Sequence, residues 1–205
     1  MNHSFNARLT WLLSIFVCAA AVSLSFKCID VPVAQWFSGN LGQLDSVGAG
    51  LGSAVLLSIE AAIVITLVVV RLVRGRLSPL SEALALASLA SMCTYAVNDG
   101  VLKLFFGVPN PADVLLQGAH HAFHFLAGSR GSSFPSGHMV LVGSFAGVFM
   151  KLYPSSIWPL SALLFIGAAI LIFGDWHFAS DVIAGTFAGV SAGLLAGKLW
   201  QVHSS

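Results

Sequence analysis

The chain has 205 residues, of which 57% are hydrophobic and 8% are charged, whereas a soluble domain carries roughly 25% charged residues. This shortage of charge extends along the whole length, so it excludes an ordinary soluble protein and predicts a polytopic membrane protein. The formal net charge of +1 gives no support for a nucleic-acid partner. The cysteines Cys18, Cys28 and Cys93 are odd in number and scattered, which argues against a disulfide framework and against a zinc site.

Apolar stretches of spanning length, about 20 residues each, follow one another along the chain. Six candidates lie at about Thr10–Phe26, Ala49–Val73, Leu80–Phe106, Gly137–Tyr153, Ser156–Phe173 and Val182–Trp200. We therefore predict an all-α fold, with six transmembrane helices in one bundle and a single membrane-embedded domain over residues 1–205. The first stretch also resembles a signal peptide, although its apolar run is long for one. Between the first two stretches, Ile29 to Gly48 is predicted to lie along the interface as an amphipathic segment.

The distribution of basic residues predicts the orientation of the bundle. With both termini in the cytoplasm, six basic residues face inward and three face outward, which agrees with the positive-inside rule. The inner set is Arg8, Arg71, Arg74, Arg76, Lys151 and Lys198, and the outer set is Lys27, Lys103 and Arg130. The short loops favour a bacterial inner membrane, with the outer side facing the periplasm.

The fourth apolar stretch begins with a group of residues suited to anion binding, Pro135-Ser136-Gly137-His138. Ser136 is a typical N-cap residue, and Gly137 allows the backbone to approach a ligand closely. The free N–H groups and the positive dipole end of a helix that starts here would bind an anion such as phosphate. His138 would be placed beside that anion to give or take a proton. Taken alone, the same residues also fit an ordinary capped helix with an interfacial histidine.

The last apolar stretch is preceded by His177 and Asp181, whose i,i+4 spacing places them on one helical face if the helix already begins near His177. A carboxylate that holds one imidazole nitrogen leaves the other free as a nucleophile or base. A stripe of glycines, Gly185, Gly189, Gly193 and Gly197, continues the Asp181 face and would let another helix approach closely. Asp181 is therefore expected to face the bundle.

Lys103, at the outer end of the third stretch, would by itself be a snorkelling lysine. However, Lys103, His138 and the His177–Asp181 pair all fall on the outer side of the predicted topology. A cation and a helix N-terminus for an anion, a paired histidine for attack and a second histidine for the leaving group together fit phosphoryl transfer through a phosphohistidine. No cofactor or metal is required by that chemistry.

These residues resemble the type 2 phosphatidic acid phosphatase superfamily, over about Asn98 to Gly185. The family pattern has three parts: Lys, six residues, Arg-Pro; then Pro-Ser-Gly-His; then Ser-Arg, five residues, His, three residues, Asp. The corresponding segments here begin at Lys103 and end at Asn110-Pro111, stand unchanged at Pro135 to His138, and run from Ile170-Leu171 to His177 and Asp181. The resemblance implies that His177 is the nucleophile, that Asp181 orients it and that His138 protonates the leaving oxygen. It also implies that Lys103, Ser136 and the Gly137 amide hold the phosphoryl oxygens.

Both arginines of the family pattern are missing, because Asn110 and Leu171 stand in their places. Charge-assisted hydrogen bonds contribute roughly 1.5–3 kcal/mol each, so their loss weakens or redirects phosphate binding. Asn110 can still donate a neutral hydrogen bond, and Arg130 is the candidate substitute for the missing charge, although it also fits a loop cation at the headgroup level.

Other polar residues have less certain roles. Glu60 lies within an apolar stretch, where it is either functional or a protonated hydrogen-bonding group. Asp99, one turn before Lys103, is expected to pair with it. His120, His121 and His124 lie in the longest loop, Gly107 to Phe134, and a metal site there is not favoured because no carboxylate shares their spacing.

The function that fits best is a membrane lipid phosphatase that cleaves a phosphomonoester or pyrophosphate from a lipid at the outer leaflet. The first alternative is a lipid phosphotransferase with the same chemistry. The second is a phospholipid-binding or transport protein with a degenerate site, which the joint presence of His138, His177 and Asp181 argues against. The sequence leaves the lipid, the acceptor and the oligomeric state undetermined.

Overall fold

The computed structural model describes residues 2–41 and 46–204, and within them the chain is helical with no strand. The long helices are α1 (Asn2–Cys28), α3 (Ser46–Arg74), α4 (Pro79–Val97), α7 (Gly137–Leu152), α8 (Ile157–Phe173) and α9 (Ala179–Ser204). Shorter helices are α2 (Asp30–Leu41), α5 (Lys103–Phe106) and α6 (Pro111–Leu116), with a π-helical turn at Asn98–Leu102 and a 3-10 turn at Pro154–Ser156. The prediction of an all-α fold is confirmed.

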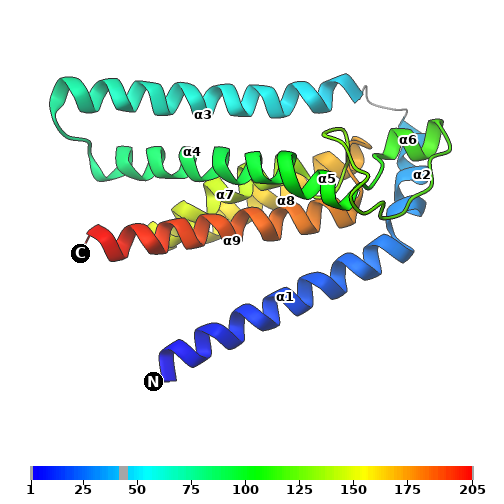
Figure 1. Cartoon of the computed structure of the whole chain (residues 1–205), viewed down its shortest axis with the longest axis horizontal. Coiled ribbons are helices and arrows are strands. Elements are labelled where there is room, and N and C mark those ends of the chain that lie inside the picture. Colours follow the sequence, from blue (N-terminus) through cyan, green and yellow to red (C-terminus); the bar gives the residue numbers. More distant parts are fainter. Residues whose placement is uncertain (1, 42–45, 205) are drawn as a thin grey trace.

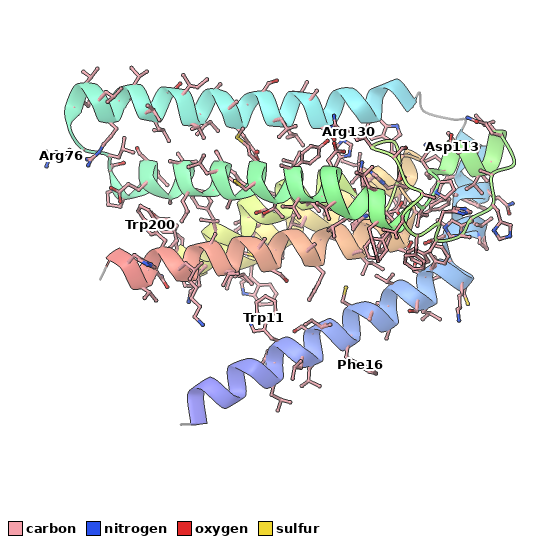
Figure 2. All side chains as sticks on the ribbon, viewed as in Figure 1. Trp11, Phe16, Arg76, Asp113, Arg130 and Trp200 are labelled. Atoms are coloured by element: carbon pink, nitrogen blue, oxygen red, sulfur yellow. The ribbon has the colours of Figure 1, made fainter. Side chains whose placement is uncertain are left out.

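The long helices form a bundle, and different elements lie at its two ends (Figure 1). Helices α2 and α6, the loop around α6 and the start of α9 gather at one end. Both termini and the connection between α3 and α4 lie toward the other end, where Arg76 is also placed (Figure 2). The predicted site residues and the basic cluster are thus at opposite ends of the bundle.

Within the part of the chain that the structure describes, five helical segments are long and apolar enough to cross a membrane: Leu9–Cys28, Gly52–Arg74, Pro79–Leu116, Pro154–Phe173 and Ala179–His203. The sixth predicted span, Gly137–Tyr153, corresponds to α7, which has 16 residues. At about 1.5 Å per residue this helix is roughly 24 Å long, shorter than the roughly 30 Å hydrocarbon core. The count of six spans therefore stays a prediction. Helix α7 is largely buried among its neighbours, so protein rather than lipid covers most of it.

The contact between α7 and α9 is the most extensive helix contact in the bundle, and glycines remove the side chains that would separate the two backbones. A Cβ atom at Gly189 would lie 2.6 Å from the carbonyl oxygen of Val140, and one at Gly147 would lie 2.5 Å from that of Val190. The expected glycine stripe thus packs on α7. Asp181, on the same face, is fully buried, as that face requires.

Local signals set the helix boundaries near the predicted site. The Ser136 side chain caps α7, and Gly107 ends α5 with a left-handed backbone (φ 60°), a conformation that glycine adopts without strain. The predicted interfacial segment Ile29 to Gly48 contains α2, which lies across the end of the bundle (Figure 1). Residues 42–45 of that prediction lie outside the described residues.

Candidate active site

His177 and Asp181 meet at the start of α9, as their spacing predicts. Helix α9 begins at Ala179, so His177 lies in the preceding turn rather than on the helix itself. His177 Nδ1 is 3.5 Å from Asp181 Oδ2, and the same oxygen accepts a 2.9 Å hydrogen bond from the Phe178 amide. Both side chains are buried, His177 at 8% exposure and Asp181 at 0%.

Ser133 joins this pair, and the sequence reasoning did not identify it. Its hydroxyl donates to Asp181 Oδ2 and lies 3.1 Å from His177 Nδ1. Because a hydroxyl has one proton, and this one goes to Asp181, Ser133 Oγ can only accept from His177. In the neutral ring Nδ1 then carries the proton, which leaves Nε2 of His177 with a free lone pair. The only available signal was the position of Ser133 three residues before Ser136, and that position alone does not reveal its partners.

His138 lies in the first turn of α7, close to His177. The two ring centroids are 5.7 Å apart and nearly perpendicular, with an interplanar angle of 73°. His138 Nε2 is 3.1 Å from Ser53 Oγ of α3, a second contact that the sequence did not predict. The backbone amide of Ser136 donates a 3.0 Å hydrogen bond to the Asp181 carbonyl oxygen, which joins the start of α7 directly to the start of α9.

Gly137 packs closely against α4. A Cβ atom at Gly137 would lie 2.9 Å from the Tyr95 ring, so its lack of a side chain makes room for Tyr95. Binding of phosphate by its backbone amide stays a prediction. Asn98, fully buried in the π-helical turn, donates a 3.2 Å hydrogen bond to the Pro135 carbonyl oxygen. Together Tyr95 and Asn98 hold the Pro135–His138 segment against the end of α4.

Lys103 follows the π-helical turn and lies close to the loop that carries Arg130. Its Nζ is 3.8 Å from Asp99 Oδ1, which confirms the expected pair, and it donates a 3.3 Å hydrogen bond to the Arg130 carbonyl oxygen. The other Asp99 oxygen is 3.7 Å from Arg130 Nε. One carboxylate therefore sits between the two cations that were predicted to bind phosphate.

The residues that stand in place of the two family arginines, Leu171 and Asn110, have structural roles. Leu171 is 5% exposed and belongs to the apolar core, while its carbonyl oxygen accepts a 3.2 Å hydrogen bond from the His177 amide. Asn110 caps α6: its Oδ1 accepts from the Asp113 amide at 2.9 Å, and its Nδ2 donates to the Asp113 carboxylate at 2.7 Å. The Arg130 side chain is 82% exposed and lies at the same end of the bundle as Asp113 (Figure 2).

A cavity of about 400 Å³ opens beside these loops, with Asn110 in its wall. Its lining residues are Pro109, Asn110, Asp113, Gln117, Ala119, Ala127, Ser129, Gly131 and Ser132. Ser132 directly precedes Ser133, so the chain that forms this wall continues into the His177–Asp181 pair.

Asp175 stands two residues before His177 with a left-handed backbone (φ 56°). Burial raises the pKa of its carboxyl group to about 6, because a charged carboxylate loses hydration there. Glu60 is buried at the face of α3 toward α4, where it interacts with Ser91. Neither Asp175 nor Glu60 is among the residues that the sequence predicted to catalyse or to bind phosphate.

The loop histidines do not form a group of metal ligands. His120 and His124 lie outside any helix, so their i,i+4 spacing does not place them on one face. Within residues 2–41 and 46–204, no cluster of three or more His, Cys, Asp or Glu side chains has an arrangement that could hold a metal ion.

A comparison with family models gives one match, to the PAP2 superfamily over residues 83–203, which is more than half of the chain. The chain belongs to the PAP2 superfamily. Members of this superfamily are generally phosphatases, and the matched segment runs from α4 to the end of α9, including Lys103, His138 and His177. Helices α1, α2 and α3 lie outside it. No curated protein and no solved structure matches the chain.

Proposed function

We propose that this PAP2 superfamily protein is a membrane-embedded lipid phosphatase that works through a phosphohistidine. The observation that carries the proposal is the arrangement around His177. Ser133 and Asp181 hold Nδ1, so the lone pair of Nε2 is available for attack, and His138 lies beside it. A protein that only binds phospholipid has no use for an oriented nucleophile next to a second imidazole.

The proposed reaction has two steps. Nε2 of His177 attacks phosphorus, the bond to the leaving oxygen breaks, and His138 gives that oxygen a proton. Asp181 stabilises the positive charge that develops on the His177 ring. Water then attacks the phosphohistidine, His138 takes a proton from it, and inorganic phosphate leaves with the histidine restored.

Phosphate binding in this proposal depends mainly on Lys103, Ser136 and the Gly137 amide. Arg130 would contribute by exchanging Asp99 for the phosphate, which the exposure of its side chain permits. Asn110 would have to release Asp113 to contribute. The loss of two family arginines, at roughly 1.5–3 kcal/mol each, therefore leads us to expect weaker binding of phosphate itself and greater dependence on the lipid part of the substrate.

The apolar helices suit an amphiphilic substrate, whose tail stays in the bilayer while its phosphate meets His177 at the end of the bundle. We propose a phosphomonoester or pyrophosphate of a lipid in the outer leaflet, six spans with cytoplasmic termini, and a bacterial inner membrane with the site toward the periplasm. The support for this orientation is that the basic residues Arg71 to Arg76 and the site lie at opposite ends of the bundle.

The test is phosphate release from a panel of lipid phosphates by the purified protein and by its His177→Ala variant. Removal of the nucleophile should lower the rate by at least about 1,000-fold. His124→Ala, which changes an exposed loop histidine, is the matched control and should keep activity. Vanadate should inhibit the unaltered protein, and an acid-labile phosphoryl group should form on it but not on the His177→Ala variant. Unchanged phosphate release in that variant would rule out the mechanism.

A Ser133→Ala variant tests the role of the hydroxyl that holds His177. The nucleophile stays in place but loses its orientation and tautomer preference, so we expect kcat to fall by about 10- to 100-fold. Equal activity in Ser133→Ala and the unaltered protein would mean that Asp181 alone orients the ring.

Product analysis separates hydrolysis from phosphotransfer, which share every step up to the phosphohistidine. With a labelled lipid phosphate alone, a phosphatase releases labelled inorganic phosphate. If the label instead moves to an added acceptor lipid at the expense of inorganic phosphate, the protein is a phosphotransferase.

A further inference from the structure

A buried carboxylate outside the family-matched segment contacts the residues that carry His177. Asp30, the first residue of α2, is 1% exposed. Its Oδ1 accepts hydrogen bonds from Ser25 Oγ of α1 at 2.8 Å and from the Ser180 amide of α9 at 3.0 Å. Its Oδ2 accepts from the Ser180 hydroxyl. A carboxylate this deeply buried is costly unless its hydrogen bonds are formed, and here α1 and α9 supply them.

An aromatic group closes the remaining side of Asp30. His121, from the loop after α6, places Nε2 3.6 Å from Asp30 Oδ2. Its ring stacks on Phe26 of α1 with centroids 4.1 Å apart and packs on Phe178 at 4.4 Å. Burial lowers the pKa of His121, against the opposing effect of the carboxylates of Asp30 and Asp181. The His121 ring therefore covers the carboxylate on the side that Ser25 and Ser180 leave open.

The segment from His177 to Asp181 is consequently held by two carboxylates. Asp181 accepts from the Phe178 amide at 2.9 Å, and Asp30 accepts from the Ser180 amide at 3.0 Å. The two amides belong to residues one and three positions after the proposed nucleophile, His177. We propose that Asp30 is a positioning residue for His177: it fixes the first turn of α9 from outside and thereby sets the distance of the His177 ring from Ser133 and Asp181.

This inference rests on the proposed function of His177 as nucleophile. Without Asp30, the amide and hydroxyl of Ser180 would both remain buried without an acceptor, and the turn would shift to find one. A displacement of about 1 Å at the reacting atom can lower a rate by about 100-fold. It follows that α2, which the family match does not include, is part of the support of the active site.

The experiment compares full-length variants by kcat, KM and thermal stability in the same detergent. Asp30→Ala should lower kcat by about 10- to 100-fold with KM changed by less than about threefold. Asp30→Asn keeps an oxygen that can accept from Ser180, so it should recover part of the loss. Ser25→Ala removes a donor to the same carboxylate from α1 but leaves both contacts to Ser180, so its kcat should stay within about threefold of the unaltered value.

Hydrogen exchange gives a readout that does not depend on activity. The amides of Phe178 and Ser180 should exchange faster in Asp30→Ala than in Ser25→Ala. If kcat per folded molecule and the exchange of these amides are unchanged in Asp30→Ala, the inference is wrong. The inference is also wrong if Ser25→Ala has the same effect, because Asp30 would then serve only to join α1 to the bundle. If His177→Ala still releases phosphate, the proposed function fails, and the exchange data still decide whether Asp30 holds the turn.

Discussion

At the scale of single residues, serine hydroxyl groups contact the ring nitrogens of His177 and His138. Ser133 determines which nitrogen of His177 carries the proton, and Ser53 contacts His138 Nε2 at 3.1 Å. Neither serine is chemically unusual in the sequence. Ser133 is buried, and a buried hydroxyl has few possible partners, so its hydrogen bonds fix the geometry of His177 and Asp181.

Asp175 is the residue whose charge should make stability depend on pH. Its pKa is raised to about 6 by burial, so between about pH 4 and 6 the folded state binds more protons than the unfolded state. Stability should then fall as pH rises through this range and stay level above it. Asp175→Asn removes the charge and tolerates the left-handed backbone (φ 56°). Because the group is partly exposed and screened, we expect a melting temperature about 2–4 °C higher than that of the unaltered protein at pH 7, and no gain at pH 4.

Thermal unfolding in detergent at several pH values measures this effect. Asp175→Ala serves as the control, because it removes the same charge. Alanine has no polar side chain to ease the left-handed backbone, so this variant should lose about 1–2 kcal/mol of stability at every pH. If the melting temperatures of Asp175→Asn and the unaltered protein differ by the same amount at every pH, the pH dependence does not come from Asp175.

At the scale of helices, the glycine contact between α7 and α9 determines how the site is assembled. The proposed acid, His138, is on α7, and the nucleophile precedes α9. The two helices approach closely because glycine lines their contact, and Gly185 continues this contact to the site, where its Cβ position lies 2.6 Å from the Ser136 carbonyl oxygen. Separating the helices would therefore separate the two histidines.

A Gly189→Ala variant tests this packing. The added Cβ atom would lie 2.6 Å from the Val140 carbonyl oxygen, and backbone cannot move aside as a flexible side chain can. We expect a loss of about 1–3 kcal/mol of stability together with a lower kcat. Gly167→Ala on α8 is the matched control, because nothing lies within 4 Å of its Cβ position, and it should be neutral or stabilising. Equal stability of the two variants would show that α7 and α9 can separate at no cost.

At the scale of the whole molecule, the bundle has a basic end and a site end. Arg76 and both termini lie toward one end, and Arg130 and Asp113 lie at the other (Figure 2). In a membrane, the positive-inside rule would place the Arg76 end in the cytoplasm, and the site would then face outward.

Single cysteines placed at the two ends test this orientation in intact cells. The three cysteines of the chain are free, so they can be replaced by serine before Gln117→Cys or Arg76→Cys is introduced, both at exposed positions. A maleimide that does not cross membranes should label Gln117→Cys from outside and label Arg76→Cys only after permeabilisation. The reverse pattern would invert the topology and place the site in the cytoplasm.

The sequence by itself determined the helical class and the family, because apolar length, helix-cap residues and motif spacing are local properties of the chain. It predicted His138, His177 and Asp181 as site residues. It also predicted the Asp99–Lys103 pair, whose partners are one helical turn apart. It did not reveal Ser133 beside His177, Ser53 beside His138 or Asp30 beside Ser180. Those features depend on which helix faces which, and partners separated by 44, 85 and 150 residues along the chain meet only when the bundle is packed. The candidate residues could therefore be predicted from local sequence, whereas the contacts between them were decided by the tertiary structure.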